Sequence, residues 1–228
     1  MELYIIAASR GNYERIAAQL EQETGHRFVW IRDREQLRLD KLAEYDPKKI
    51  FFPHWSYMIP EEVYSKYECV IFHMTDVPFG RGGSPLQNLI SRGVYETKIS
   101  AIRCVRELDA GPVYMKAPLS LHGTAEEILL RAADVIHGMI YKIIAEQPEP
   151  NPQTGEPVVF RRRTKEQGNI SSLRSLREVY DFIRMLDAEG YPRAYLETEH
   201  FIFEFERASL KQDEIIADVR IRRKEEST

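Results

Sequence analysis

The first half of the chain alternates short apolar runs with longer segments whose apolar residues recur every three or four positions. Four runs have the length of strands and are apolar almost throughout: LYIIAAS, RFVWI, KKIFFP and CVIFH. The segments between them have the spacing of amphipathic helices, the first with Ile16, Ala17 and Leu20 on one face and Gly25 at its end. Strands without polar alternation are typical of a parallel sheet covered on both faces. The pattern therefore predicts an α/β fold, with a Rossmann-like, mostly parallel sheet and helices on both faces.

The following segments depart from this alternation. Only five residues separate TKISAIRCV from GPVYMKAPLS, which predicts a hairpin instead of another helical crossover. The segment SPLQNLISRG predicts a helix with Ser84 as N-cap and Pro85 at the first helical position. The longest helical pattern is TAEEILLRAADVIHGMIYKIIAEQ, where Thr124 and Glu127 have the spacing of a capping box.

Prolines mark a division in the chain after this helix. The stretch PEPNPQTGEP has four prolines in ten residues, which predicts a linker or extended arm over residues 148–160. A catalytic domain is then expected over 1–147, and a small C-terminal α+β appendage, a helix and a β-hairpin, over 161–228. In the appendage Phe201, Phe203 and Phe205 alternate with polar residues. One face of that strand is therefore expected to be buried, with a homodimer contact as a candidate.

Composition narrows the functional classes. A net charge of −4 and a pI near 5.9 argue against a dedicated nucleic-acid binder, so no nucleic-acid partner is expected. Cys69 and Cys104 lie in apolar runs, which predicts free, buried thiols in a reducing compartment. We see neither a signal-peptide pattern nor an apolar run of about 18 residues, so we expect a cytoplasmic protein without membrane contact. The histidines lack metal-ligand spacing, and no metal is expected.

Two polar stretches interrupt this apolar framework. His73 ends the strand CVIFH and precedes the glycine-rich turn PFGRGG, which contains Arg81. In open parallel sheets, ligands bind beyond the carboxyl ends of the strands, and backbone N–H groups near a helix start favour negative charge. Asp109 lies at the tip of the predicted hairpin. Each residue alone has a structural explanation, because His73 can close the strand and Asp109 can form a turn. Neither G-x-G-x-x-G nor a P-loop is present, which argues against nicotinamide and P-loop chemistry.

Taken together, the two stretches resemble the 10-formyltetrahydrofolate-dependent formyltransferase family. The first has the pattern H-x-x-x-x-P-x-x-R-G-x-x-P from His73 to Pro85, and the second has L-D-x-G-P from Leu108 to Pro112. The resemblance covers residues 1–145. The phrase FHMTDVPFGRGGSPLQNLI is most similar to amino-sugar N-formyltransferases of the pseudaminic acid pathway, and formylation domains of nonribosomal peptide synthetases are also similar.

The resemblance implies roles for two side chains. His73 donates to the developing oxyanion or passes on a proton, and Asp109 orients the imidazole and helps to deprotonate the acceptor amine. The family has an asparagine two residues before the histidine, where this chain has Ile71, whose side chain donates no hydrogen bond. Asn88 is the first candidate for a replacement donor, followed by Gln87 and Thr75.

The resemblance also implies binding residues for the folate. It places the pterin against the segment before Leu108, which gives the cofactor-binding candidates Ile102, Cys104, Val105 and Glu107, together with Arg81 and Gly82 of the glycine turn. Arg81 is equally well explained as a structural residue of that turn. The substrate-binding candidates are His54 and Trp55, which end the third strand, and Thr75. An aromatic ring there can stack on a ligand ring, with a core tryptophan as the alternative.

The family resemblance does not identify the amine that accepts the formyl group. We expect formyl transfer from 10-formyltetrahydrofolate to the amine of a nucleotide-linked 4-amino sugar of the pseudaminic-acid type, with Arg161, Arg162 and Arg163 as candidate diphosphate ligands. One alternative is a catalytically weak folate- or nucleotide-binding domain, which Ile71 favours. Another is a formylation domain acting on an aminoacyl group, bound to tRNA or to a carrier. The acidic charge and the short appendage argue against tRNA.

Overall fold

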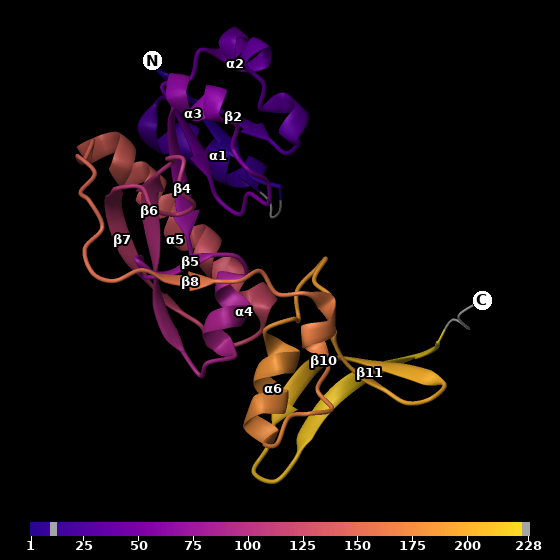
Figure 1. Cartoon of the computed structure of the whole chain (residues 1–228). Coiled ribbons are helices and arrows are strands. Elements are labelled where there is room, and N and C mark those ends of the chain that lie inside the picture. Colours follow the sequence, from indigo (N-terminus) through magenta and orange to yellow (C-terminus); the bar gives the residue numbers. More distant parts are fainter. Residues whose placement is uncertain (10–12, 225–228) are drawn as a thin grey trace. The chain divides into compact units, whose positions relative to one another are not determined.

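The structure is a computed structural model that describes residues 1–9 and 13–224 (Figure 1). The chain divides into two compact units, each assembled from separate stretches. The first unit comprises Met1–Gly82, Thr97–Leu119 and Leu130–Val159, and the second comprises Gly83–Glu96, Ser120–Leu129 and Phe160–Thr228. The predicted domains, by contrast, are continuous segments with boundaries at residues 147 and 160, and this division stays a prediction.

A six-stranded sheet forms the centre of the first unit, in the order β2-β1-β3-β4-β6-β7. Strands β1, β2, β3 and β4 pair in parallel, and β6 joins β4 antiparallel. Their bounds are Leu3–Ala7 (β1), Arg27–Ile31 (β2), Lys49–Phe52 (β3), Glu68–His73 (β4), Glu96–Arg103 (β6) and Val113–Ser120 (β7). The predicted mostly parallel sheet is therefore confirmed, and β6 and β7 are neighbours, as the predicted hairpin requires.

Both faces of this sheet are buried, which explains why its strands lack polar alternation. On one face, Ile5, Ile50 and Cys69 belong to a buried cluster with Leu42 and Val63. These two residues come from α2 (Leu39–Tyr45) and α3 (Glu61–Lys66). The alternate residues of the same strands point to the other face and are also buried: Tyr4, Ile6, Phe51, Val70 and Phe72.

Among the remaining elements of the first unit, the helices follow the predicted pattern, whereas two short strands were not predicted. Helix α1 (Tyr13–Thr24) ends before Gly25, and a 3-10 turn, η1 (Arg34–Gln36), precedes α2. Helix α5 (Ala125–Glu146) belongs to both units, with Leu130 onward in the first. Its predicted capping box is present, because the backbone N–H groups of Thr124 and Glu127 each donate to the other residue's side chain. The short strands β5 (Phe79–Gly82) and β8 (Val158–Phe160) pair with each other.

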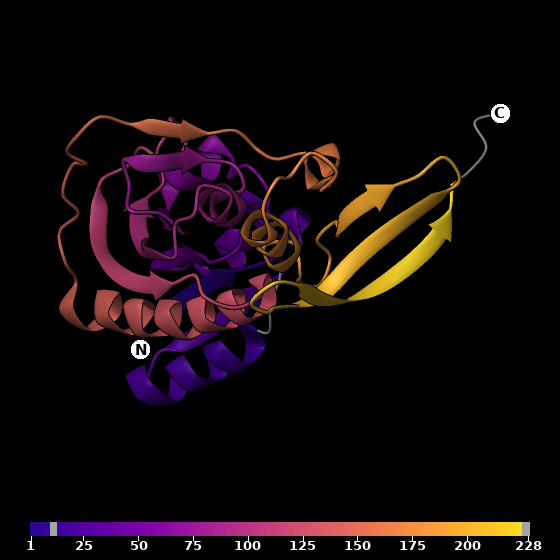
Figure 2. The same cartoon turned by 90° about the horizontal axis from the view of Figure 1, so that it is seen from below.

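The second unit contains a three-stranded antiparallel sheet in the order β11-β10-β9 (Figure 2). Its strands are Ala194–Glu197 (β9), Phe201–Leu210 (β10) and Ile215–Arg223 (β11), and α6 (Leu176–Arg184) packs against β10. A 3-10 turn, η2 (Lys165–Gly168), follows β8. Phe201 is 44% exposed and both Phe203 and Phe205 are only half-buried, so the chain by itself does not fully cover the expected apolar face. A homodimer contact there stays a prediction.

Ser84 is at the predicted N-cap position, but its side chain makes no capping hydrogen bond. Helix α4 spans Pro85–Ile90, with Pro85 at its start as expected, but Ser84 has φ of +50° and its side chain does not cap the helix. Its hydroxyl instead accepts a hydrogen bond from the backbone N–H of Arg163 at 3.1 Å. The Ser84 hydroxyl oxygen therefore accepts a hydrogen bond from a residue distant in sequence, and not from the N–H groups of the helix that it precedes.

Both cysteines are free thiols, as predicted; Cys69 is buried and Cys104 is half-buried. Within residues 1–9 and 13–224, we find no helix that is long and apolar enough to cross a membrane.

Candidate active site

His73 ends β4 and is 7% exposed. Its Nε2 lies 2.7 Å from the carbonyl oxygen of Gly80 in the following turn. Because a carbonyl only accepts hydrogen bonds, Nε2 carries a proton and Nδ1 is the nitrogen left for other partners. The backbone just after His73 is also held, since Ser100 on β6 donates its hydroxyl to the carbonyl of Thr75 at 2.7 Å.

Asp109 lies in the connection between β6 and β7 and is 8% exposed. Its Oδ2 is 3.5 Å from Nδ1 of His73 and accepts a hydrogen bond of 2.9 Å from the backbone N–H of Gly82. The residue has φ of +52°, a conformation that costs a non-glycine residue about 1–2 kcal/mol. The structure thus brings together the imidazole and the carboxylate that the two sequence stretches contribute.

The glycine turn contributes its backbone to this site, whereas its arginine points to another partner. Arg81 donates from Nε and Nη2 to the side-chain oxygen of Gln153, at 3.0 and 2.7 Å. Gln153 also donates to the carbonyls of Asp109 and Gly111. Gln153 was not predicted as a site residue, because a glutamine in a proline-rich arm has no recognisable functional pattern. These bonds agree with the structural interpretation of Arg81.

Asn88, the first candidate for the missing amide donor, belongs to the second unit, whereas His73 and Asp109 belong to the first. Its side-chain nitrogen donates to the carbonyls of Gly83, Ser84 and Arg161 at 2.9–3.1 Å, and its oxygen accepts from Arg92. Both amide hydrogens are therefore already engaged. Gln87, also in the second unit, has its side-chain nitrogen 3.4 Å from the carbonyl of Met185, and Thr75 donates to Gly80 at 3.3 Å.

The folate candidates lie on or beside the connection that contains Asp109. Ile102 is buried in β6 and faces Ile71 across the β4–β6 pairing. Cys104 and Val105 are half-buried just after that strand, and Glu107 is exposed. Burial raises the pKa of the Cys104 thiol to about 11, with a contribution from the charge of Asp109. This charge interaction is consistent with Cys104 lying near the carboxylate.

His54 and Trp55 follow β3, as predicted. The backbone of His54 has φ of +49°, and its carbonyl accepts a hydrogen bond from the hydroxyl of Ser9 at 3.0 Å. The Trp55 ring meets Phe52 and Tyr57 edge to face, with centroids 5.8 and 5.4 Å apart. Its indole Nε1 is buried and has no hydrogen-bond partner in the described part of the chain. An unpaired buried donor fits a ligand that offers an acceptor.

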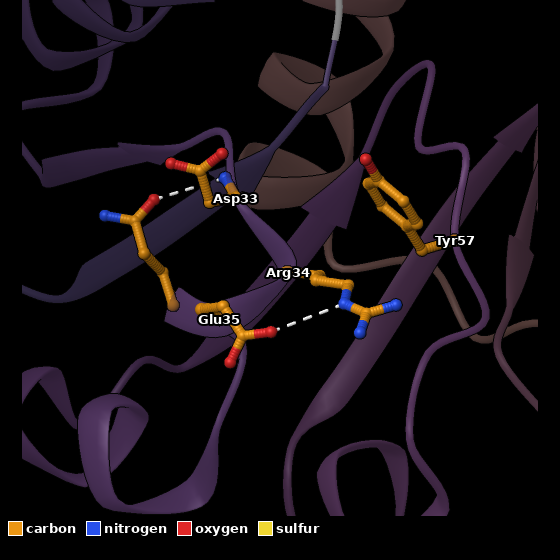
Figure 3. Close-up of a pocket in the computed structure, with 5 residues that line it drawn as sticks. Asp33, Arg34, Glu35 and Tyr57 are labelled. Atoms are coloured by element: carbon orange, nitrogen blue, oxygen red, sulfur yellow. Dashed lines mark hydrogen bonds and ion pairs between the residues drawn. The ribbon is translucent and has the colours of Figure 1, made fainter.

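A pocket of about 490 Å³ lies beside the 3-10 turn that follows β2 (Figure 3). It is lined by Asp33, Arg34, Glu35, Gln36 and Tyr57, none of which is a predicted site residue. Figure 3 shows Arg34 paired with Glu35, at 3.4 Å, and both side chains are about 70% exposed. Because the Arg34–Glu35 pair is solvated and no predicted site residue lines the pocket, we assign no role to this hollow. Among the residues that the structure describes, no group of three or more His, Cys, Asp or Glu side chains could hold a metal ion.

Comparison with known proteins places the chain in a family. Residues 165–222 match a family described as the C-terminal domain of methionyl-tRNA formyltransferase. A solved methionyl-tRNA formyltransferase from Clostridium thermocellum is 44% identical, with a TM-score of 0.95 over 98% of this chain and 100% of that one. The chain belongs to the formyltransferase family. The chain spans only about half the length of the other methionyl-tRNA formyltransferases that it matches; it covers 55% of the one from Bacillus cytotoxicus, at 29% identity over 174 residues.

Two more distant structures share only the fold with this chain. HypX from Aquifex aeolicus in complex with tetrahydrofolic acid is 18% identical, with a TM-score of 0.72 over 91% of this chain and 38% of that one. A sugar N-formyltransferase from a Shewanella species is 13% identical, with a TM-score of 0.68 over 87% of this chain and 94% of that one. The relatives of higher identity are named for methionyl-tRNA. Their names therefore do not support the expected pseudaminic-acid assignment, and they conflict with the expectation of no nucleic-acid partner.

Proposed function

We propose that this formyltransferase moves the formyl group of 10-formyltetrahydrofolate to a primary amine, with His73 and Asp109 as its catalytic pair. The observation that carries the proposal is the approach of Nδ1 of His73 to Oδ2 of Asp109, 3.5 Å apart and both shielded from solvent. The carboxyl ends of parallel strands are also the usual place for a ligand in such sheets. The folate supplies the formyl carbon. The tetrahydrofolate bound to HypX, a structure of the same fold, supports a folate as the donor.

The roles follow from the hydrogen bonds of the two residues. In the transfer one C–N bond forms at the acceptor amine, one breaks at the folate nitrogen, and one proton moves from the amine to that nitrogen. Because Nε2 of His73 donates to Gly80, only Nδ1 is left for the reacting groups; in the ring form protonated on both nitrogens, Nδ1–H donates a hydrogen bond to the developing oxyanion. Asp109, anchored by the N–H of Gly82, takes the proton of the amine directly or through one water.

For the acceptor we propose an aminoacyl amine, with methionyl-tRNA as the first substrate to test. This choice rests on the names of the relatives with higher identity and on the family match over residues 165–222. It replaces the nucleotide-linked amino sugar as our main interpretation. The formal charge of −4 describes the whole chain and does not exclude a local contact with phosphates through Arg161 and Arg162, which are both exposed.

The test is a formyl-transfer assay with the full chain, 10-formyltetrahydrofolate and either methionyl-tRNA or a UDP-linked 4-amino sugar. We expect transfer to methionyl-tRNA, and a loss of about 10²–10⁴-fold in His73→Ala and Asp109→Ala. Asp213→Ala serves as a matched control, because this carboxylate is exposed in the turn between β10 and β11.

The outcomes separate the alternatives. Full activity in both site variants would show that the catalytic pair is misassigned. Transfer to the sugar alone would restore the pseudaminic-acid interpretation. Tight folate binding without transfer to either amine would favour a catalytically weak binding domain, as Ile71 suggests.

A further inference from the structure

The proline-rich arm after α5 is attached to the first unit at three points. Asn151 exchanges two backbone hydrogen bonds with Val113, of 2.7 and 2.9 Å. The backbone N–H of Val158 donates to the carbonyl of Pro78 at 3.1 Å, where β8 begins beside β5 (Figure 1). Between these two attachments lies Gln153, whose side chain makes the third. The arm is therefore held on both sides of this glutamine.

The amide of Gln153 makes four hydrogen bonds. Its oxygen accepts from Nε and Nη2 of Arg81 at 3.0 and 2.7 Å. Its nitrogen donates to the carbonyls of Asp109 and Gly111 at 2.9 and 2.8 Å. Two hydrogens and two lone pairs are all that a glutamine side chain has, so none is left for water. A half-buried glutamine on a solvated arm has no need of such complete pairing.

These bonds support the most strained part of the site. Asp109 holds a left-handed backbone conformation, which persists only where the surroundings enforce it. The Gln153 nitrogen links the carbonyl of Asp109 to that of Gly111, two residues further on. Its oxygen holds Arg81, whose neighbour Gly82 donates to the Asp109 carboxylate. One side chain thus joins both segments that fix the carboxylate.

We propose that Gln153 is a positioning residue, which holds the Asp109 carboxylate against His73 during catalysis. The inference rests on the proposed formyl transfer for its kinetic readout. Gln153 itself contacts only Arg81 and the turn, and acts through Asp109. Displacing that carboxylate by about 1 Å is expected to slow the transfer by up to about 100-fold.

Two variants distinguish the bonds that Gln153 accepts from Arg81 from the bonds that it donates to the Asp109 turn. Gln153→Ala removes all four bonds. Gln153→Glu keeps both acceptors for Arg81 and adds a charge pair, but it places a carboxylate oxygen against the carbonyls of Asp109 and Gly111. If the turn is the part that matters, both variants lose at least tenfold in kcat, while KM for the folate changes by less than about twofold. Thr154→Ala, at the next and exposed position of the arm, is the control and keeps the wild-type kcat.

A second readout does not depend on activity. We expect the amide hydrogen of Gly82, which donates to Asp109, to exchange at least tenfold faster in Gln153→Ala than in the wild type or in Thr154→Ala, as measured by NMR. Wild-type kcat in Gln153→Glu would overturn the proposal, because it would leave only an anchor for Arg81. A lower melting temperature with unchanged kcat and unchanged Gly82 exchange would overturn it as well. Absence of transfer in the wild type, together with faster Gly82 exchange in Gln153→Ala, would refute the proposed function and support the positioning role.

Discussion

Replacing Gly111 by alanine tests the geometry on which the site depends. Gly111 is buried two residues after Asp109, in the connection between β6 and β7. A Cβ atom added there would lie 1.8 Å from the backbone oxygen of Arg103 and 3.5 Å from Cγ1 of Val105. The contact at 1.8 Å is with backbone, which cannot rotate away as a side chain can. The connection therefore has to move, or the end of β6 has to move.

The size of the effect follows from these distances. Real Cβ atoms stay at least 3.0 Å from other heavy atoms, so relief requires a shift of about 1.2 Å. Arg103 is restrained on two sides, because it pairs with Val70 of β4 and its N–H donates to the carbonyl of Pro112 at 2.9 Å. Overpacking against such a restrained backbone costs about 1–3 kcal/mol of unfolding free energy. A displacement of about 1 Å at Asp109 costs a further factor of about 100 in turnover.

Urea unfolding followed by tryptophan fluorescence measures the stability part. Trp30 and Trp55 both belong to the first unit, which also contains Gly111. Gly138→Ala is a matched control: an added Cβ meets nothing within 4 Å, and a glycine inside helix α5 is expected to gain about 0.5–1 kcal/mol on substitution. The reasoning is refuted if Gly111→Ala unfolds within about 0.5 kcal/mol of the wild type and keeps its kcat.

Two further predictions follow from charged groups near the site. Burial opposes the ionisation of Asp76, but hydrogen bonds from Lys116 and Lys98 outweigh it and hold the pKa of this carboxyl below its usual range. The lowered folded-state pKa stabilises the protein fully above the unfolded value of about 3.9, and this stabilisation is lost progressively as the pH falls through the folded value. Asp76→Asn is therefore less stable than the wild type at pH 7, and the gap begins to narrow below about pH 4. Urea titrations at pH 7, 5 and 3.5 measure this gap, and a gap that persists unchanged to pH 3.5 contradicts it. Burial, aided by the charge of Asp109, raises the pKa of Cys104 to about 11. Iodoacetamide at pH 8 should therefore label this thiol about 100-fold more slowly in the folded protein than in urea, and faster in folded Asp109→Asn than in the folded wild type. Equal labelling rates in the folded and unfolded protein would contradict this prediction.

The central sheet was predictable because burial on both faces leaves a direct trace in the sequence. RFVWI corresponds to β2 without an error at either end, and CVIFH differs from β4 only by the added Glu68. The pair β5 and β8 was not predicted. The sequence of β5, FGRG, lacks strand propensity, and its partner β8 comes from far along the chain. Ser84 failed as a cap for the same reason, since its partner Arg163 is distant in sequence.

The site residues likewise depend on contacts between segments that are distant in sequence, which local patterns do not reveal. The pairing of His73 with Asp109 came from the family resemblance, because no local pattern joins a strand end to a hairpin tip. Asn88 was chosen for its proximity in sequence, which does not reveal that its amide is already engaged by three carbonyls. Gln153 could not be predicted from the sequence, because all the hydrogen bonds of its side chain are with segments distant in sequence.

The composition of the arm nevertheless has a physical meaning beyond that of a linker. Pro152 directly precedes Gln153, and Pro148, Pro150 and Pro157 lie on both sides of it. Proline fixes its own φ and biases the preceding residue to an extended backbone, so such a segment loses little conformational entropy when it is ordered. A flexible arm would have to pay about 1–2 kcal/mol of backbone entropy for each residue held, against a net gain of about 1 kcal/mol for each hydrogen bond made. The stiff arm therefore holds Gln153 against Arg81 and the Asp109 turn at an entropy cost that four hydrogen bonds can offset. A segment with the composition of a linker can for this reason help to position the site.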